Sequence, residues 1–161
     1  MLEALDRLLL THVAQPAVDA LQIEPTAWSR SAARTSSAAF MTSCLGIALL
    51  LVAAGRPFDC MAMLILGAAH VSSVQIDAYA GKLHRDGASA SFGRLFQIAE
   101  TLMCTWLLTY VAKVGSAPWT ALICVFLAAL LIADAVAYVS ICDKPPPPRR
   151  RNSRTMAGSG A

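Results

Sequence analysis

Four long apolar segments, separated by short polar stretches, dominate the pattern along the chain. They cover residues 37–54, 57–80, 95–112 and 117–142. A helix needs about 20 mostly apolar residues to cross the hydrocarbon of a bilayer. The pattern therefore predicts an all-α fold, an integral membrane four-helix bundle within residues 35–142.

The turns between these segments predict two tight hairpins. Gly55-Arg56-Pro57 joins a residue that commonly ends helices to one that commonly starts them. Gly115-Ser116-Ala117-Pro118 repeats this order between the last two segments, with Ser116 as a candidate N-cap. The segment between the hairpins, residues 81–93, is longer and polar.

Residues 1–34 are expected to form a short N-terminal amphipathic helix and a linker, both cytoplasmic. One helical face collects apolar side chains, Asp6 lies at the edge of that face, and Pro16 is expected to kink or end the helix. Acidic residues outnumber basic ones here, so packing against the bundle or a partner is as good an explanation as lipid binding. The apolar residues are Leu2, Leu5, Leu9 and Val13.

The placement of charge supports four crossings. Apolar residues make up 57% of the chain and charged residues only 14%, below the usual quarter. With four spans and both termini cytoplasmic, 11 of the 13 Lys and Arg residues lie inside, as the positive-inside rule requires. If segments two and three did not cross, the split would fall to 8 against 5. Abundant Ala, with Arg outnumbering Lys, points to a GC-rich bacterial genome and so to the bacterial inner membrane.

Residues 143–161 form a Pro-rich basic tail that we expect to be cytoplasmic and disordered. The four prolines at 145–148 favour a stiff extended spacer. The arginines behind it can contact anionic lipid headgroups or a partner, at about 1 kcal/mol per charge near the surface. No aromatic residues alternate with these arginines, so they are a weak signal of nucleic-acid binding, and nucleic acid is not an expected partner. These arginines are Arg149, Arg150, Arg151 and Arg154.

Ionisable residues inside the spans form the candidate intramembrane polar site: His70, Asp77, Glu100 and Asp134. Each is costly in lipid, so each is a functional suspect. The rise of about 1.5 Å per residue places the three carboxylates in the inner half and His70 near mid-membrane. We expect these groups to hold helices together by hydrogen bonds. A proton- or ion-conducting site and a divalent-metal site remain alternatives, although no metal ligand is assigned.

Small residues on the last segment predict close helix packing. They recur at every fourth position and would let two backbones approach each other, inside the bundle in preference to an oligomer. Trp106, which lies deeper than the interfacial aromatics, is expected to be a packing residue. The small residues are Ala129, Ala133 and Ala137, joined by Ala121 and Ala128, and the expected counterparts are Ser43, Gly46 and Gly67.

No motif for nucleophilic, metal-dependent or nucleotide-dependent catalysis occurs in the sequence. We therefore expect no enzyme, no catalytic residue and no cofactor. The expected function is that of a non-enzymatic subunit or accessory protein of a membrane complex, with lipids and a protein partner or a second copy as its contacts. The alternative is a small oligomeric proton- or cation-coupled transporter or channel. A phage-type pore-forming lysis protein is a third reading.

Overall fold

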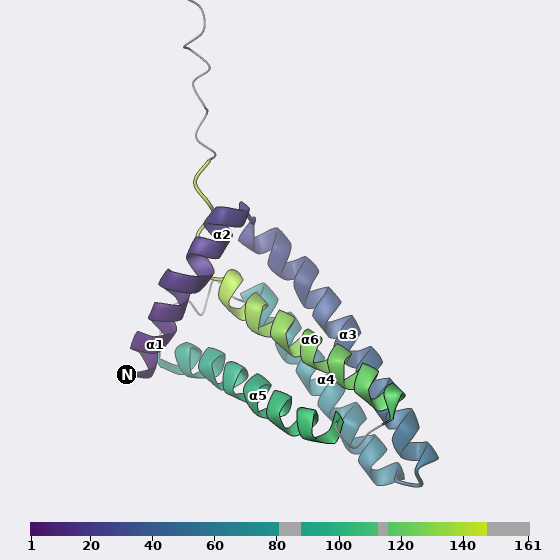
Figure 1. Ribbon diagram of the computed structural model, residues 1–161. Coiled ribbons are helices and arrows are strands. Elements are labelled where there is room, and N and C mark those ends of the chain that lie inside the picture. The colour runs from purple at the N-terminus through teal and green to yellow at the C-terminus, as the bar shows by residue number, and fades with distance from the viewer. Residues whose placement is uncertain (81–87, 113–115, 148–161) are drawn as a thin grey trace, which may run out of the picture.

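The computed structural model describes residues 1–80, 88–112 and 116–147, and the side chains of 76–80, 88 and 107–112 are outside this description. Every regular element in the described part is helical (Figure 1). The elements in chain order are α1 (Leu2–Leu9), the π-helical turn η1 (Leu10–Ala14), α2 (Gln15–Leu21), α3 (Pro25–Ala53), α4 (Pro57–Ala80), α5 (Ala88–Ala112) and α6 (Ala117–Val139).

The N-terminal helical segment continues through Pro16 to Leu21, so the expectation that Pro16 kinks or ends it is wrong in one respect. A proline ring clashes with the carbonyl four residues earlier. Here η1 lies directly before the proline, and a π turn widens the backbone at the place where that clash would fall. The segment ends at Gln22, whose φ of 52° reverses the chain direction.

α3 and α4 form the first expected hairpin. α3 begins at Pro25, well before the predicted span start at residue 37, because Pro25 occupies a favourable first helical position. Its 29 residues reach about 43 Å, which exceeds the roughly 30 Å of hydrocarbon. Gly55 then adopts a φ of 74°, and α4 starts at Pro57. The Gly-Arg-Pro turn is thus confirmed.

The core lies where α3 packs against α4 and α6. Ala129 and Ala133 are fully buried, and Ala137 is nearly so, which confirms that these three small residues of α6 serve contacts inside the chain. Ala121 and Ala128, which were expected to join them, are exposed. The absence of bulk brings the backbones close enough for the Ser36 hydroxyl to donate a hydrogen bond of 2.7 Å to the Ala129 carbonyl. Phe40 fills the neighbouring layer beside Phe126.

Two glycines mark further close approaches. A Cβ on Gly67 would lie 3.2 Å from the Cys44 side chain, which puts α4 tightly against α3. A Cβ on Gly46 would lie 2.5 Å from a terminal methyl of Leu122 on α6. Ser43, the third expected counterpart, is completely buried.

In the described part of the chain, α5 has less contact with its neighbours than the other long helices have. It packs against α6 and against α1, which together with α2 crosses the end of the bundle where α5 begins and α6 ends (Figure 1). Ser116 occupies the N-cap position of α6 as expected, but its side chain makes no capping hydrogen bond. Trp106, expected to be a packing residue, is 72% exposed.

Three helices are long and apolar enough to cross a membrane. They are α3, the first 19 residues of α4 and α6. They indicate a multi-pass membrane protein. α5, which was compared without its last residues 107–112, is not among them.

The packing of α3 against α6 makes a direct prediction. Ala129→Leu inserts a larger side chain into a filled core and should destabilise the protein by about 1–3 kcal/mol. Ala128→Leu makes the same change one position away, where the side chain is exposed, and should leave stability unchanged. Thermal unfolding in mild detergent measures both. Equal losses of stability for the two variants would contradict this packing.

Candidate functional site

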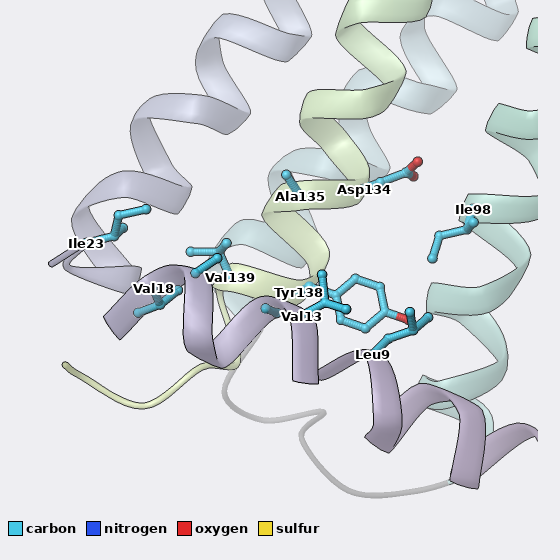
Figure 2. Close-up of a pocket in the computed structure, with 11 residues that line it drawn as sticks. Leu9, Val13, Val18, Ile23, Ile98, Asp134, Ala135, Tyr138 and Val139 are labelled. Atoms are coloured by element: carbon cyan, nitrogen blue, oxygen red, sulfur yellow. The ribbon is translucent and has the colours of Figure 1, made fainter. Parts of the chain in front are cut away.

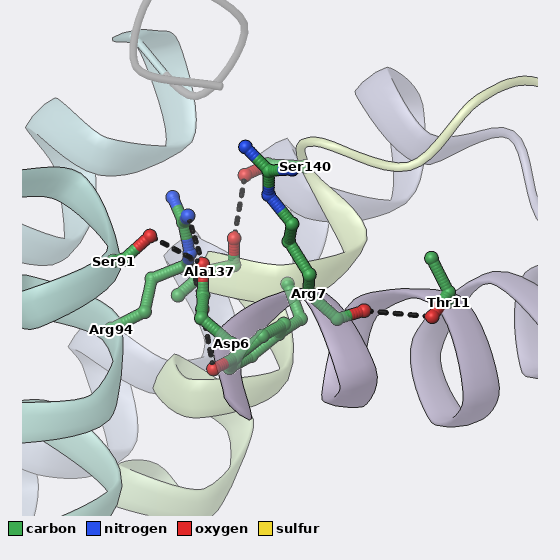
Figure 3. A network of polar contacts seen from close by, with 8 residues as sticks. Asp6, Arg7, Thr11, Ser91, Arg94, Ala137 and Ser140 are labelled. Carbon is green, nitrogen blue, oxygen red and sulfur yellow. Dashed lines mark hydrogen bonds and ion pairs between the residues drawn. The ribbon is translucent and has the colours of Figure 1, made fainter. Parts of the chain in front are cut away.

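The most connected polar group in the described part of the chain is the carboxylate of Asp6. Ser91 donates a hydrogen bond of 2.8 Å to Oδ2, and Tyr138 donates one of 2.9 Å to Oδ1. Arg94 donates from Nε to Oδ1 at 3.0 Å and from Nη2 to Oδ2, so its guanidinium binds both oxygens. Figure 3 shows Asp6 of α1 facing Ser91 and Arg94 of α5. We call these four residues the Asp6 network.

The Asp6 network is buried, with Asp6 3% and Arg94 9% exposed. Burial by itself raises the pKa of Asp6. The hydrogen bonds from Arg94, Ser91 and Tyr138 and the charge of Arg94 outweigh this effect, so the pKa is lowered from the ordinary 3.8. The carboxylate is therefore ionised at neutral pH and paired in the bidentate geometry that Arg favours.

Local sequence explains how the partners meet. Ser91 and Arg94 are three residues apart in the first turns of α5, so they share one face. Tyr138 is in the last turn of α6. The N-terminal segment does pack against the bundle, but through Asp6, while Leu2 and Leu5 of the expected apolar face remain half exposed.

A second contact holds α2 against the end of α6. The side chain of Gln15 accepts a hydrogen bond of 2.9 Å from the backbone N–H of Asp143 and donates one of 3.2 Å to its carbonyl. Lys144 also lies 3.2 Å from Glu24, as an exposed ion pair. The chain leaving α6 is thus fastened to the N-terminal segment beside the Asp6 network.

His70 does not join the carboxylates of the predicted intramembrane site in the described part of the chain. Its ring stacks on Phe40 of α3, with 4.1 Å between the centroids. Phe40 in turn packs on Phe126 of α6 at 4.4 Å, so aromatic rings occupy the space next to the histidine. Nε2 of His70 is buried and has no hydrogen-bond partner among the described residues.

Asp134 and Glu100 are brought near each other. Asp134 is on α6. It lies within electrostatic range of Glu100 and next to Thr101, both of α5. Oδ1 of Asp134 and Oγ1 of Thr101 are nevertheless buried without a satisfactory hydrogen bond among the described residues. Asp77, the third predicted carboxylate, lies outside the described side chains.

The remaining predicted contacts cannot be placed. Arg149, Arg150, Arg151 and Arg154 lie outside the described residues. Within the described residues, no group of three or more His, Cys, Asp or Glu side chains is arranged to hold a metal ion.

Sequence reasoning missed the Asp6 network. The sequence places Asp6 at the edge of an apolar helical face and gives it no partner. The available signal was an acidic residue beside an apolar face, together with Ser91 and Arg94 at a spacing of three. Such a pattern suggests a buried pair, but it does not identify the partner.

Comparison of the chain with protein-family models, with curated proteins and with solved structures finds no match. The function is therefore argued from the geometry of this chain alone.

Removing the charge of Asp6 should release the N-terminal segment. Asp6→Asn removes the negative charge that the buried Arg94 guanidinium binds, which costs about 3 kcal/mol or more. Trypsin cleavage after Arg7 of the detergent-purified protein should then accelerate by about 100-fold, because each 1.4 kcal/mol corresponds to a factor of ten. Glu3→Gln, an exposed carboxylate on the same helix, is the matched control. Equal cleavage rates for the two variants would exclude a stabilising Asp6 network.

The lowered pKa of Asp6 sets the sign of the pH dependence. The stabilisation is fully present above the unfolded pKa near 3.8 and is lost as pH falls through the lower folded pKa. A spin label on Glu3→Cys should therefore stay immobilised down to about pH 4 and become mobile only below it. In Asp6→Asn the label should be mobile throughout. A midpoint well above 3.8 would contradict the assignment.

Proposed function

We propose that this chain is a four-span protein of the bacterial inner membrane that acts as a non-enzymatic interaction subunit. Both termini are cytoplasmic, and the subunit binds a membrane helix of another chain along α5. The observation that carries the proposal is the periodic apolar face of α5, which α6 and α1 leave uncovered.

The Asp6 network supports α5 as the fourth span. It joins the N-terminal segment to the start of α5 and the end of α6. α5 therefore starts on the side of the bundle where α6 ends, so the two neighbours are antiparallel. A crossing α5 requires this arrangement. The short Gly55 turn lies at the other end of the bundle (Figure 1).

The apolar face of α5 has the spacing of a helix-packing seam. Its large members, at relative positions 0, 4, 11 and 14, are more than half exposed, and Ala99 fills the intermediate position. Gly93 lies nearby, and a Cβ there would meet nothing within 4 Å, which leaves room for an approaching helix. The large members are Phe92, Phe96, Met103 and Trp106.

A partner helix would also stabilise α5 in the membrane, where its polar residues are unfavourable. The helix brings Arg94, Gln97 and Glu100 towards the membrane, and polar groups in hydrocarbon are expensive. Contact with α6 and α1 covers one side only. Packing with a second helix would add close contacts and stabilise the helix in the bilayer.

The transporter alternative has less support. A conduction path needs polar groups in succession through the membrane. In the described part of the chain, His70 faces aromatic rings and Asp134 faces α5, and no hydrogen bond joins them. This arrangement favours an interaction subunit over a proton or ion path within one chain.

Site-specific photocrosslinking tests the proposal. Benzoylphenylalanine at Met103 of α5 should yield one discrete protein adduct in native membranes. The same label at Leu131 of α6, a residue of similar exposure, should yield none. An adduct of twice the chain mass would identify the partner as a second copy. The absence of any protein adduct at position 103 would overturn the proposal.

A further inference from the structure

The N-terminal segment crosses the bundle at the level where a candidate membrane span ends. α6 (Ala117–Val139) has the highest mean hydropathy of the three helices that can cross a membrane. Tyr138 and Val139, in its last turn, line an apolar groove (Figure 2). Leu9 and Val13 of the N-terminal segment line the same groove from the other side. The segment therefore lies at the boundary between hydrocarbon and headgroups, a depth that tyrosine rings favour.

Two further leucines of α1 are on the side of the helix that faces the bundle. Leu2, Leu5 and Leu9 follow each other at spacings of three and four residues, so the 3.6-residue period puts them on one face. Leu9 points from this face towards the last turn of α6 (Figure 2). Asp6, at the edge of the same face, binds residues of α5 and α6. Leu2 and Leu5 therefore point towards the membrane layer and away from the water beyond the bundle.

Protein covers these two leucines only in part. Each is 49% exposed in the described part of the chain, and Leu8, on the flank of the same face, is 51% exposed. They belong to the part of the N-terminal segment that extends away from α6 towards the start of α5 (Figure 1). Apolar side chains that are exposed at this level meet the acyl chains of the leaflet, and burying their surface there is favourable.

The charged side chains of α1 lie away from the leucine face and favour no particular lipid charge. Glu3 and Arg7 are exposed and four residues apart, on the other side of the helix. The charge of Asp6 is paired with that of Arg94 inside the protein. The exposed side chains of α1 therefore carry one negative and one positive charge. The attraction to the bilayer must come from apolar surface, as it does for amphipathic helices that lie in the interface.

We propose that α1 is an interfacial helix, and that its face with Leu2 and Leu5 is immersed in the acyl chains of the leaflet in which α6 ends. This surface is separate from the apolar face of α5, and the inference needs only that α3 and α6 cross the membrane. Because Asp6 of the same helix binds Arg94, the contact of α1 with lipid fixes the depth at which α5 begins.

The accessibility of a nitroxide label on the full chain in phosphatidylcholine vesicles tests this inference. The label is attached singly through Leu5→Cys or Arg7→Cys in a cysteine-free background, at a high ratio of lipid to protein. At Leu5→Cys it should collide with oxygen about threefold more often than with a water-soluble nickel complex, as expected at the depth of about 5–10 Å that interfacial helices reach. At Arg7→Cys, on the other side of the same helix, the nickel complex should collide more often. Added phosphatidylglycerol should change neither ratio.

A second label position guards against misfolding of a single variant. Leu2→Cys lies on the same face as Leu5 and should also favour collisions with oxygen. A label that favours the nickel complex at both leucine positions faces water, and a label that neither reagent reaches is covered by protein. Either result, or equal ratios at positions 5 and 7, would overturn the inference. None of these results would alter crosslinking at Met103.

Discussion

The Asp6 carboxylate joins α1 to two helices that are far from it in the sequence, α5 and α6. Its partners on α5 lie 85 and 88 residues away, and Tyr138 lies 132 residues away. A buried carboxylate is tolerated only when its charge and lone pairs are satisfied. The bidentate guanidinium and two hydroxyls meet this requirement, and in doing so they fix the N-terminal segment across the end of the bundle.

The positions of the N-terminal segment and of α5 follow from this contact. With the N-terminal segment in place, its apolar residues form one wall of an apolar groove against the end of α6. With the start of α5 held by Asp6, α5 packs on α6 by one face and presents its heptad-spaced apolar face outward. The α3–α4–α6 core stands apart from this region, because it depends on small residues and on the layer around Phe40.

The sequence predicted the features that local rules control. The Gly55 turn requires a positive φ, and the small-residue stripe at Ala129 and Ala133 requires close backbones, so both could be read from residue type and spacing. The Asp6 network could not, because periodicity places polar residues on the solvent side and gives no partner for them. His70 and Asp134 were expected together because helical rise gives depth in the membrane, whereas the direction a side chain faces depends on tertiary packing.

The central claim is that α5 crosses the membrane with its start on the same side as the N-terminal segment. Cysteine labelling of the full chain tests it most directly. Ser89→Cys, at the start of α5, and Ser116→Cys, just beyond its end, are introduced singly at exposed positions in a cysteine-free background. A membrane-impermeant maleimide added to intact bacterial cells should label Ser116→Cys and leave Ser89→Cys unlabelled. Labelling of both positions, or of neither while both react after lysis, would contradict a crossing α5.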